Sequence, residues 1–167
     1  MAEDVYYEDL SAFTLSDAEC EELLSTQGES TFCWSTGDGA PVGVIMAHVW
    51  RNGRVWLTAT RQRARIKAIR RDPRCAVVVT STGTKLPPAR TVTIRGTCVV
   101  HEDAETKAWF YPALAARVVP EPGAAQDAFC TNLDSELRVV IEVIPEKWIT
   151  CDAQKMMEDS FAALGVR

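Results

Sequence analysis

Short runs of β-branched and aromatic residues alternate with turn residues along most of this chain, a pattern typical of antiparallel strands. We expect strands at residues 31–35, 41–50, 54–60, 75–80, 90–101 and 137–144, and a further short strand around Trp148. Helical spacing and end signals predict helices at residues 16–27, 61–71, 103–117, 124–131 and 153–164. Hairpin-connected strands interrupted by helices predict an α+β fold built on a small closed or half-closed barrel.

Two turn signals organise these strands. Asn52-Gly53 lies between two runs rich in Val, Ile and Trp, and both residues tolerate the positive φ of a tight hairpin turn. We therefore expect the strand at 41–50 to pair with the strand at 54–60. Gly37-Asp38-Gly39 predicts a second turn, and Gly96 predicts a bulge or bend in a long strand.

The chain of 167 residues is expected to be one domain, with an N-terminal arm and helix (1–30), a barrel (31–152) and a C-terminal helix (153–167). Residues 1–13 are expected to form an arm or an opening strand. Ser16 and Glu19 have the spacing of a capping box, which indicates where the first helix begins. A domain of this size buries roughly 70% of the surface of its unfolded chain, so it needs no disulfide or metal to fold.

The composition excludes several classes of protein. No segment approaches the ~20 apolar residues of a membrane span. The first twenty residues are acidic and lack the basic start of a signal peptide. The six cysteines show no close pair and no metal-ligand spacing. We therefore expect a cytoplasmic protein with reduced thiols, no bound metal and no membrane partner.

Positive charge is concentrated in one segment. Residues 51–74 contain nine of the chain's 18 basic residues and one acid, whereas the whole chain has a net charge of −5. In this segment a strand ending at Thr58-Ala59-Thr60 is followed by a helix that carries Arg65 and Lys67. Helix N-terminal amides attract phosphate and guanidinium groups bind it bidentately, so this junction is a candidate phosphate site. The alternatives are a solubilising helix face and a nucleic-acid surface; the overall negative charge disfavours the latter, and we expect no nucleic-acid partner.

The sequence offers no motif for catalysis by a protein side chain. It has no Ser-His-Asp order, no glycine-rich phosphate loop, no paired-acid motif and no thiol–histidine pair. His48 and His101 are the only histidines. A lone histidine in a strand is more often structural than catalytic, so His48 is a candidate only for contact with a bound ring. We expect no catalytic side chain.

The order of these features resembles the pyridoxamine-phosphate-oxidase-like split-barrel superfamily over residues 31–152. The resemblance rests on Gly39-Ala40-Pro41, on the hairpin that follows, and on the basic run from Arg65 to Arg74, which ends Arg-Arg-Asp-Pro-Arg. The tail from Arg138 to Asp152, with Ile-Pro-Glu-Lys in its middle, is similar to the final strand of flavin and deazaflavin oxidoreductases of actinobacterial type.

The resemblance implies a homodimer of split β-barrels with a flavin-type cofactor lying across the subunit interface. The expected cofactor is flavin mononucleotide (FMN), with the deazaflavin coenzyme and then haem as alternatives. Hydride would pass between the cofactor and a small organic substrate without a protein nucleophile. A non-catalytic flavin- or haem-binding module on the same fold is the other function to consider. Matching positions place Ile45, Met46 and Ala47 beside the isoalloxazine ring, and Thr58, Ala59, Thr60, Arg65 and Lys67 at the phosphate.

The sequence departs from the family pattern at several positions. Arg65 stands where a Lys is usual, Ala59 where many relatives carry Thr, and Cys151 where an aromatic residue is common. Arg and Lys differ in geometry, so the choice between the cofactors stays open. The terminal Arg-containing pattern of true pyridoxamine phosphate oxidases is absent from the sequence, which disfavours a role in vitamin metabolism.

Overall fold

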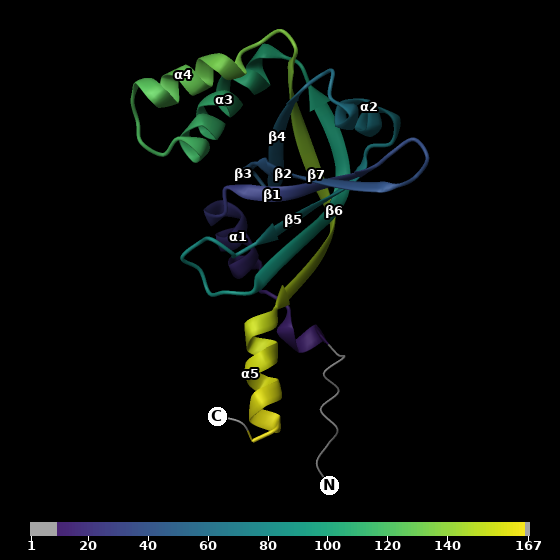
Figure 1. Ribbon diagram of the computed structural model, residues 1–167, viewed down its shortest axis with the longest axis vertical. Helices are drawn as coiled ribbons and strands as arrows, with labels where there is room; N and C mark the ends of the chain where they lie inside the picture. Colours follow the sequence, from purple (N-terminus) through teal and green to yellow (C-terminus); the bar gives the residue numbers. More distant parts are fainter. Residues whose placement is uncertain (1–9, 166–167) are drawn as a thin grey trace.

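A computed structural model describes residues 10–165 as one curled sheet with helices around it (Figure 1). The sheet has seven strands in the order β2-β1-β5-β6-β7-β4-β3, and neighbouring strands are antiparallel. The strands are β1 (Glu29–Ser35), β2 (Pro41–Ala47), β3 (Val49–Arg51), β4 (Arg54–Thr60), β5 (Arg74–Thr80), β6 (Arg90–His101) and β7 (Arg138–Asp152).

The two edge strands of this sheet, β2 and β3, are consecutive in the sequence and are separated only by His48. The chain therefore links one edge of the sheet to the other and curls the sheet into a barrel that is open along part of its wall. This arrangement confirms the predicted α+β split barrel of mainly antiparallel strands.

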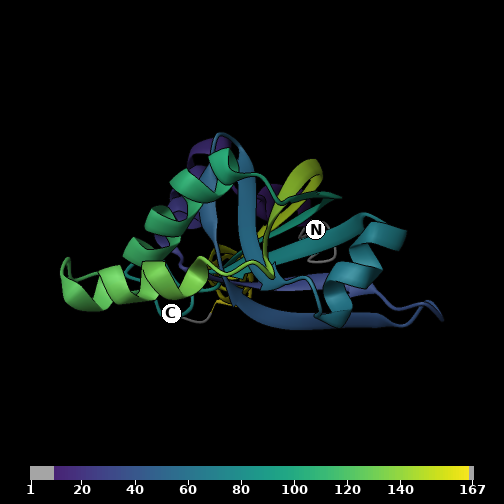
Figure 2. The same cartoon turned by 90° about the horizontal axis from the view of Figure 1, so that it is seen from above.

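The helices cover different parts of the barrel. Figure 2 shows α3 and α4 together on one side and α2 on the other. Leu23 and Leu24 of α1 and Ile66 of α2 are buried in the barrel core. α3 and α4 pack outside the barrel, where Phe110 and Leu133 form a second apolar cluster with strand residues. The helices are a 3-10 turn η1 (Leu10–Phe13), α1 (Asp17–Thr26), α2 (Ala64–Arg71), α3 (Ala104–Val118), α4 (Ala124–Leu133) and α5 (Ala153–Ala163).

The pairing of the second predicted strand differs from the expectation. The stretch 41–50 is broken at His48, and β2 pairs with β1 through the Gly37-Asp38-Gly39 turn. Only β3 pairs with β4 through Asn52-Gly53, whose φ angles of 54° and 68° confirm the predicted turn. The predicted hairpin is therefore correct at its turn and wrong in its length.

The last strand is one continuous element and not two. β7 runs through Pro145, which lies opposite Gly96 at a register shift in β6. A Cβ on Gly96 would lie 2.0 Å from the Ile144 carbonyl oxygen, so only glycine fits this approach. The predicted bulge at Gly96 is confirmed, and it explains how the ladder accommodates a proline.

The predicted helices are present with small shifts at their ends. The capping box of Ser16 and Glu19 is confirmed, with both reciprocal hydrogen bonds present. The basic helix begins at Ala64 and not at Arg61. Of the predicted arm or strand at 1–13, residues 1–9 lie outside the described part, and Leu10–Phe13 form the 3-10 turn.

Within residues 10–165, no helix is long and apolar enough to cross a membrane. The same part of the chain contains no cluster of three potential metal ligands.

Candidate functional site at the opening of the barrel

The barrel wall is open where β2 and β4 separate. β3 pairs with β4 only from Val49 to Arg51. If this register continued past His48, Ala47 would lie opposite Thr58 and Ile45 opposite Thr60. Among the described residues, however, this stretch of β4 pairs only with β7. The side of β4 toward β2 thus presents unpaired backbone groups, which need water or a ligand. Both stretches predicted to contact the cofactor line this opening.

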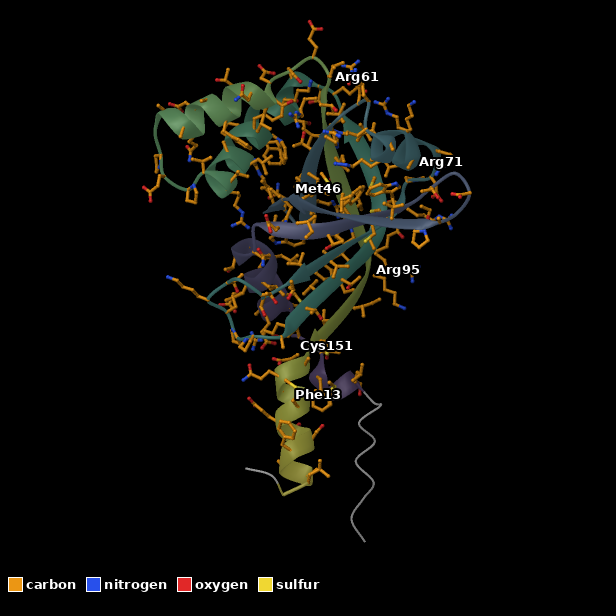
Figure 3. All side chains as sticks on the ribbon, in the orientation of Figure 1. Phe13, Met46, Arg61, Arg71, Arg95 and Cys151 are labelled. Carbon is orange, nitrogen blue, oxygen red and sulfur yellow. The ribbon has the colours of Figure 1, made fainter. Side chains whose placement is uncertain are left out.

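The three predicted ring contacts on β2 lie on two faces, with Ile45 and Ala47 on the outer face and Met46 on the inner one. Ile45 is 71% exposed on the outer face of the sheet. Met46 packs against the barrel core, and Ala47 packs against the cluster beneath α3 (Figure 3 labels Met46). Ile45 is therefore the side chain able to cover a flat ring, while Met46 and Ala47 offer their backbone.

The three predicted phosphate contacts on β4 are also not equivalent. Ala59 points into the core and is 4% exposed, whereas Thr58 and Thr60 share the outer face. The Thr58 hydroxyl donates to the Val139 carbonyl oxygen at 2.8 Å, so its hydrogen is already engaged. Within residues 10–165 the Thr60 side chain makes no hydrogen bond, and only its carbonyl is engaged, by the Arg63 amide at 3.0 Å. Thr60 is the threonine with a free donor.

Helix α2 begins next to Thr60 without a capping side chain. Arg63 is its N-cap residue and makes no side-chain cap hydrogen bond. The amides of Ala64 and Arg65 belong to the first turn, where a helix has no internal acceptors for its N–H groups. Such amides form a general anion site.

Among the predicted site residues, Arg65 has a buried side-chain donor that lacks a hydrogen-bond partner within residues 10–165. This donor is its Nε, and its guanidinium carbon lies 5.9 Å from the centre of the Trp34 ring. Burial, and to a lesser extent the Arg63 cation, lowers the pKa of the Arg65 guanidinium. A buried N–H donor on a cation lowers the stability of the fold when it has no acceptor, and an anion bound beside it would remove this cost. A phosphate group at this junction would supply that anion, so the residues present fit the phosphate of a flavin-type cofactor.

Lys67 does not share the position of Arg65. Residues two apart on an α-helix are rotated by about 200° and do not face each other. Lys67 is exposed, whereas Arg65 is half-buried. Thr60 thus ends β4 and the half-buried Arg65 lies in the first turn of α2, whereas Lys67 is on the exposed side of this helix.

In the basic segment 51–74, five of the nine cations make an ion pair or a side-chain hydrogen bond within the described residues. Figure 3 shows two of these, Arg61 near the start of α2 and Arg71 near its end. The four without an ion pair or side-chain hydrogen bond in residues 10–165 are Arg51, Arg63, Arg65 and Lys67, and the last three lie near the start of α2. Of these, Arg51 lies over the Trp109 ring and Arg65 over the Trp34 ring. The engaged cations are Arg54 with Glu142, Arg61 and Arg70 with Glu102, Arg71 with the Ser35 carbonyl, and Arg74 with Asp72.

His48 is fully buried where β2 passes into β3. Its Nε2 lies 3.3 Å from the Leu24 carbonyl oxygen, and its Nδ1 has no partner in the described part of the chain. Burial lowers the pKa of His48 to about 4. The geometry therefore supports a neutral structural histidine and not a contact with a bound ring.

Two features of this region were not predicted. Arg138 is the cross-strand neighbour of Thr60, and its buried Nε has no partner within residues 10–165. His101 lies between two carboxylates, with its Nε2 2.9 Å from Glu142 Oε2 and its Nδ1 3.6 Å from Asp103 Oδ2. The positions of Arg138 and Glu142 depend on how β7 pairs with β4 and β6, and no local sequence signal reports that pairing.

Known proteins share this architecture. Residues 16–152 match the pyridoxamine 5'-phosphate oxidase family. The conserved hypothetical protein Rv2991 from Mycobacterium tuberculosis is 18% identical, with a TM-score of 0.76 over 88% of this chain and 91% of its own. An F420 reductase is 25% identical, with a TM-score of 0.61 over 77% of this chain and 94% of its own. HutZ, a heme storage protein from Vibrio cholerae, is 11% identical, with a TM-score of 0.60 over 81% and 94%. The chain matches no curated protein in sequence.

Proposed function

Because the chain belongs to the pyridoxamine 5'-phosphate oxidase family, we propose that it is an oxidoreductase that binds a flavin-type cofactor at the opening between β2 and β4. The cofactor is FMN or, as the alternative, the deazaflavin coenzyme, and hydride passes between it and a small organic substrate. The likeness to an F420 reductase supports the deazaflavin alternative. The six cysteines are free thiols, which fits the reducing cytoplasm, where we place the protein.

The observation that carries this proposal is the buried Nε of Arg65, which has no hydrogen-bond partner within residues 10–165. The uncapped first turn of α2 and the Thr60 hydroxyl are further donors, and residues 61–63 connect this strand end to the helix. A phosphate monoester has the charge and the acceptor oxygens to satisfy such a set.

When bound, the cofactor supplies the hydride chemistry, and the chain supplies binding and orientation. Arg65, Thr60 and the α2 amides hold the phosphate, and the unpaired backbone of β4 faces the rest of the cofactor. Ile45 shields one side of the ring from water. His48 is buried and so is not available as an acid at the opening, and solvent provides the proton.

The outer face of the sheet supports a homodimer that completes the cofactor site. The two ends of one row of side chains on this face, Ile45 and Ile149, are 71% and 51% exposed. We expect this apolar face to pair with its copy and to bury about 1,600 Å² or more, as stable interfaces do. The row crosses five strands in register as Ile45, Thr31, Val78, Thr93 and Ile149.

The proposal is tested by the absorbance of the purified protein and by titration with FMN and with the deazaflavin coenzyme, followed by fluorescence. Arg65→Ala should weaken binding of the preferred cofactor about 10- to 100-fold, since a hydrogen bond to a charged group contributes about 1.5–3 kcal/mol. Lys67→Ala should have a smaller effect because Lys67 points away from the junction. Arg74→Ala is the matched control, because it removes the same charge from a side chain that is 82% exposed and paired with Asp72.

Three results would separate the alternatives. Equal losses for Arg65, Lys67 and Arg74 would indicate a diffuse anion surface and remove the local phosphate site. Haem absorbance without flavin binding would replace the oxidoreductase with a haem-binding module. A protein that binds the cofactor but exchanges no hydride with any quinone or nitroaromatic acceptor in a panel would be a non-catalytic flavin-binding module.

A further inference from the structure

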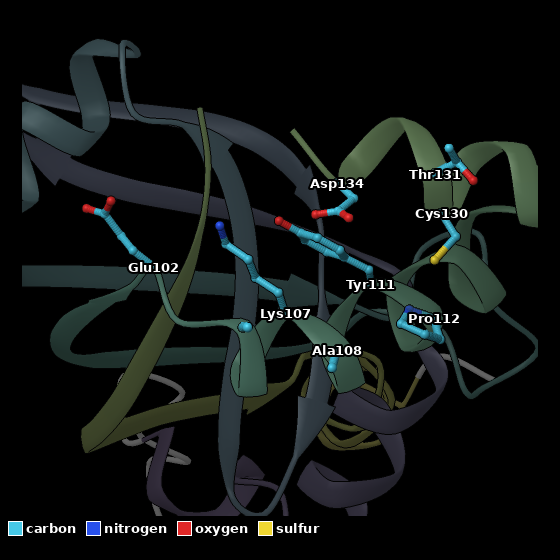
Figure 4. Close-up of a pocket in the computed structure, with 9 residues that line it drawn as sticks. Glu102, Lys107, Ala108, Tyr111, Pro112, Cys130, Thr131 and Asp134 are labelled. Carbon is cyan, nitrogen blue, oxygen red and sulfur yellow. The ribbon is translucent and has the colours of Figure 1, made fainter. Parts of the chain in front are cut away.

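A cavity of about 580 Å³ is lined by residues of α3 and α4, by Glu102 and by Asp134 (Figure 4). Small and apolar residues of α3 form part of its wall, including Ala104, Ala108 and Pro112. Its volume is within the range of about 300–1,000 Å³ that is usual for small-molecule sites. None of its lining residues is among the residues assigned to the cofactor, although Tyr111 packs in the same cluster as Ala47.

Tyr111 contributes to this cavity and has an unsatisfied hydroxyl. The residue is 4% exposed, and its hydroxyl oxygen is buried without a hydrogen-bond partner within residues 10–165. Its ring is fixed in the second apolar cluster and lies 6.2 Å from the Phe110 ring, so the hydroxyl cannot swing out to solvent without breaking that packing. Phenylalanine would fill the same space without this penalty. The hydroxyl therefore indicates a ligand that completes its hydrogen bonding.

The charges around this hydroxyl have opposite signs. Figure 4 shows the hydroxyl directed toward the ends of the Lys107 and Asp134 side chains, which also line the cavity. Neither charge has an ion pair in the described part of the chain, whereas Glu102, a third charge at the wall, is paired with Arg61 and Arg70. The wall thus offers one free cation, one hydroxyl and one free anion.

We propose that the α3–α4 cavity binds a free amino acid or a similarly small zwitterion. The ligand carboxylate accepts from the Lys107 ammonium and the Tyr111 hydroxyl, and the ligand ammonium donates to the Asp134 carboxylate. The apolar side chain of the ligand lies against Ala108 and Pro112. This site goes beyond the proposed oxidoreductase function and does not depend on the cofactor.

The test is a titration of the full chain with L-leucine and L-phenylalanine, followed by NMR of the backbone amides. We expect shifts confined to residues 102–134. N-Acetyl-L-phenylalanine lacks the ammonium and L-phenylalaninamide lacks the carboxylate, so each should bind at least tenfold more weakly. Tyr111→Phe, Lys107→Gln and Asp134→Asn should each weaken binding at least tenfold, while Lys85→Gln, in a loop away from the cavity, should leave it unchanged.

The outcomes are decisive in both directions. Tyr111→Phe removes only an unsatisfied hydroxyl and should fold at least as stably as the native chain, so its loss of binding cannot be attributed to unfolding. Equal binding of the zwitterion and its two singly charged analogues would overturn the proposal. The absence of shifts in residues 102–134 at millimolar probe would overturn it as well, and neither result would affect the cofactor site.

Discussion

We predict that the stability of the fold falls between pH 6.5 and pH 4 because His48 must stay neutral. The side chain is fully buried, and its Nε2 faces the Leu24 carbonyl oxygen at 3.3 Å. Burial is the main cause of its lowered pKa; the nearby Arg117 lowers it further, and the hydrogen bond to Leu24 acts in the opposite direction. Arg117 itself donates to the Gln27 carbonyl oxygen at 2.8 Å. Protonated His48 would therefore be a second positive charge close to Arg117.

The size of the effect follows from the two pKa values. The unfolded chain binds the His48 proton near 6.5 and the folded chain near 4, so between these values the unfolded state holds more protons and stability rises with pH. A tenfold difference in proton affinity corresponds to about 1.4 kcal/mol, so the lowered pKa of His48 contributes about 3 kcal/mol to the free energy of unfolding. This stability is fully present above pH 6.5 and is lost as the pH falls toward 4.

Urea unfolding of the native chain and of His48→Gln, at pH 7 and at pH 4.5, measures this contribution. Glutamine can donate to the Leu24 carbonyl but does not titrate, and acidic groups common to both proteins cancel in the comparison. The free-energy difference between the two proteins should change by about 2–3 kcal/mol in favour of the variant as the pH falls. His101→Gln is the control for removing a histidine that is only partly buried. Parallel pH profiles for the native chain and His48→Gln would refute the argument.

The remaining predictions concern a close backbone approach and the outer face of the sheet. Gly96→Ala should destabilise the fold by about 3 kcal/mol or more in urea unfolding, because its Cβ would lie 2.0 Å from the Ile144 carbonyl oxygen. Gly28→Ala, whose Cβ would have no atom within 4 Å, should change stability by less than about 1 kcal/mol, and similar values for both glycines would contradict the reasoning. Ile45→Lys should leave the monomer folded, because Ile45 is 71% exposed, but should lower the mass seen in sedimentation from dimer to monomer. A native chain that sediments as a compact monomer would remove the proposed interface.

Local signals in the sequence predicted much of the fold because they act within a few residues. The Asn52-Gly53 turn requires positive φ, and the Ser16–Glu19 capping box requires only a spacing of three. The break at His48 escaped prediction because the strand is interrupted there without glycine or proline. Pro145 was expected to divide the last strand, but its backbone lies opposite a bulge in β6, and the ladder continues.

Only those residues of the candidate site that lie close together in the sequence could be predicted. The junction of Thr60 and Arg65 lies within six residues of sequence, and a strand end followed by a basic helix indicates it. The direction of each side chain depends on which face of the strand, or which side of the helix, carries it. Ala59 points into the core, and Lys67 lies on the exposed side of α2. The contribution of Arg138 depends on the pairing of β7 with β4, which joins residues 78 positions apart at Thr60.

The ion pairs of the basic segment 51–74 help to decide whether this segment binds a single phosphate group or an extended anionic polymer. Binding to a polymer releases about one counterion for each cation that meets a phosphate, so it needs many free cations along one face. Glu102 pairs with both Arg61 and Arg70, and three of the four cations without an ion pair or side-chain hydrogen bond in residues 10–165 lie at the start of α2. Burial of the Arg65 guanidinium also suits a compact anion that enters the barrel opening better than a polymer that passes over the surface. The sequence left a polyanion only as a disfavoured alternative for these nine cations, and their arrangement in the folded chain likewise favours a ligand with one phosphate group.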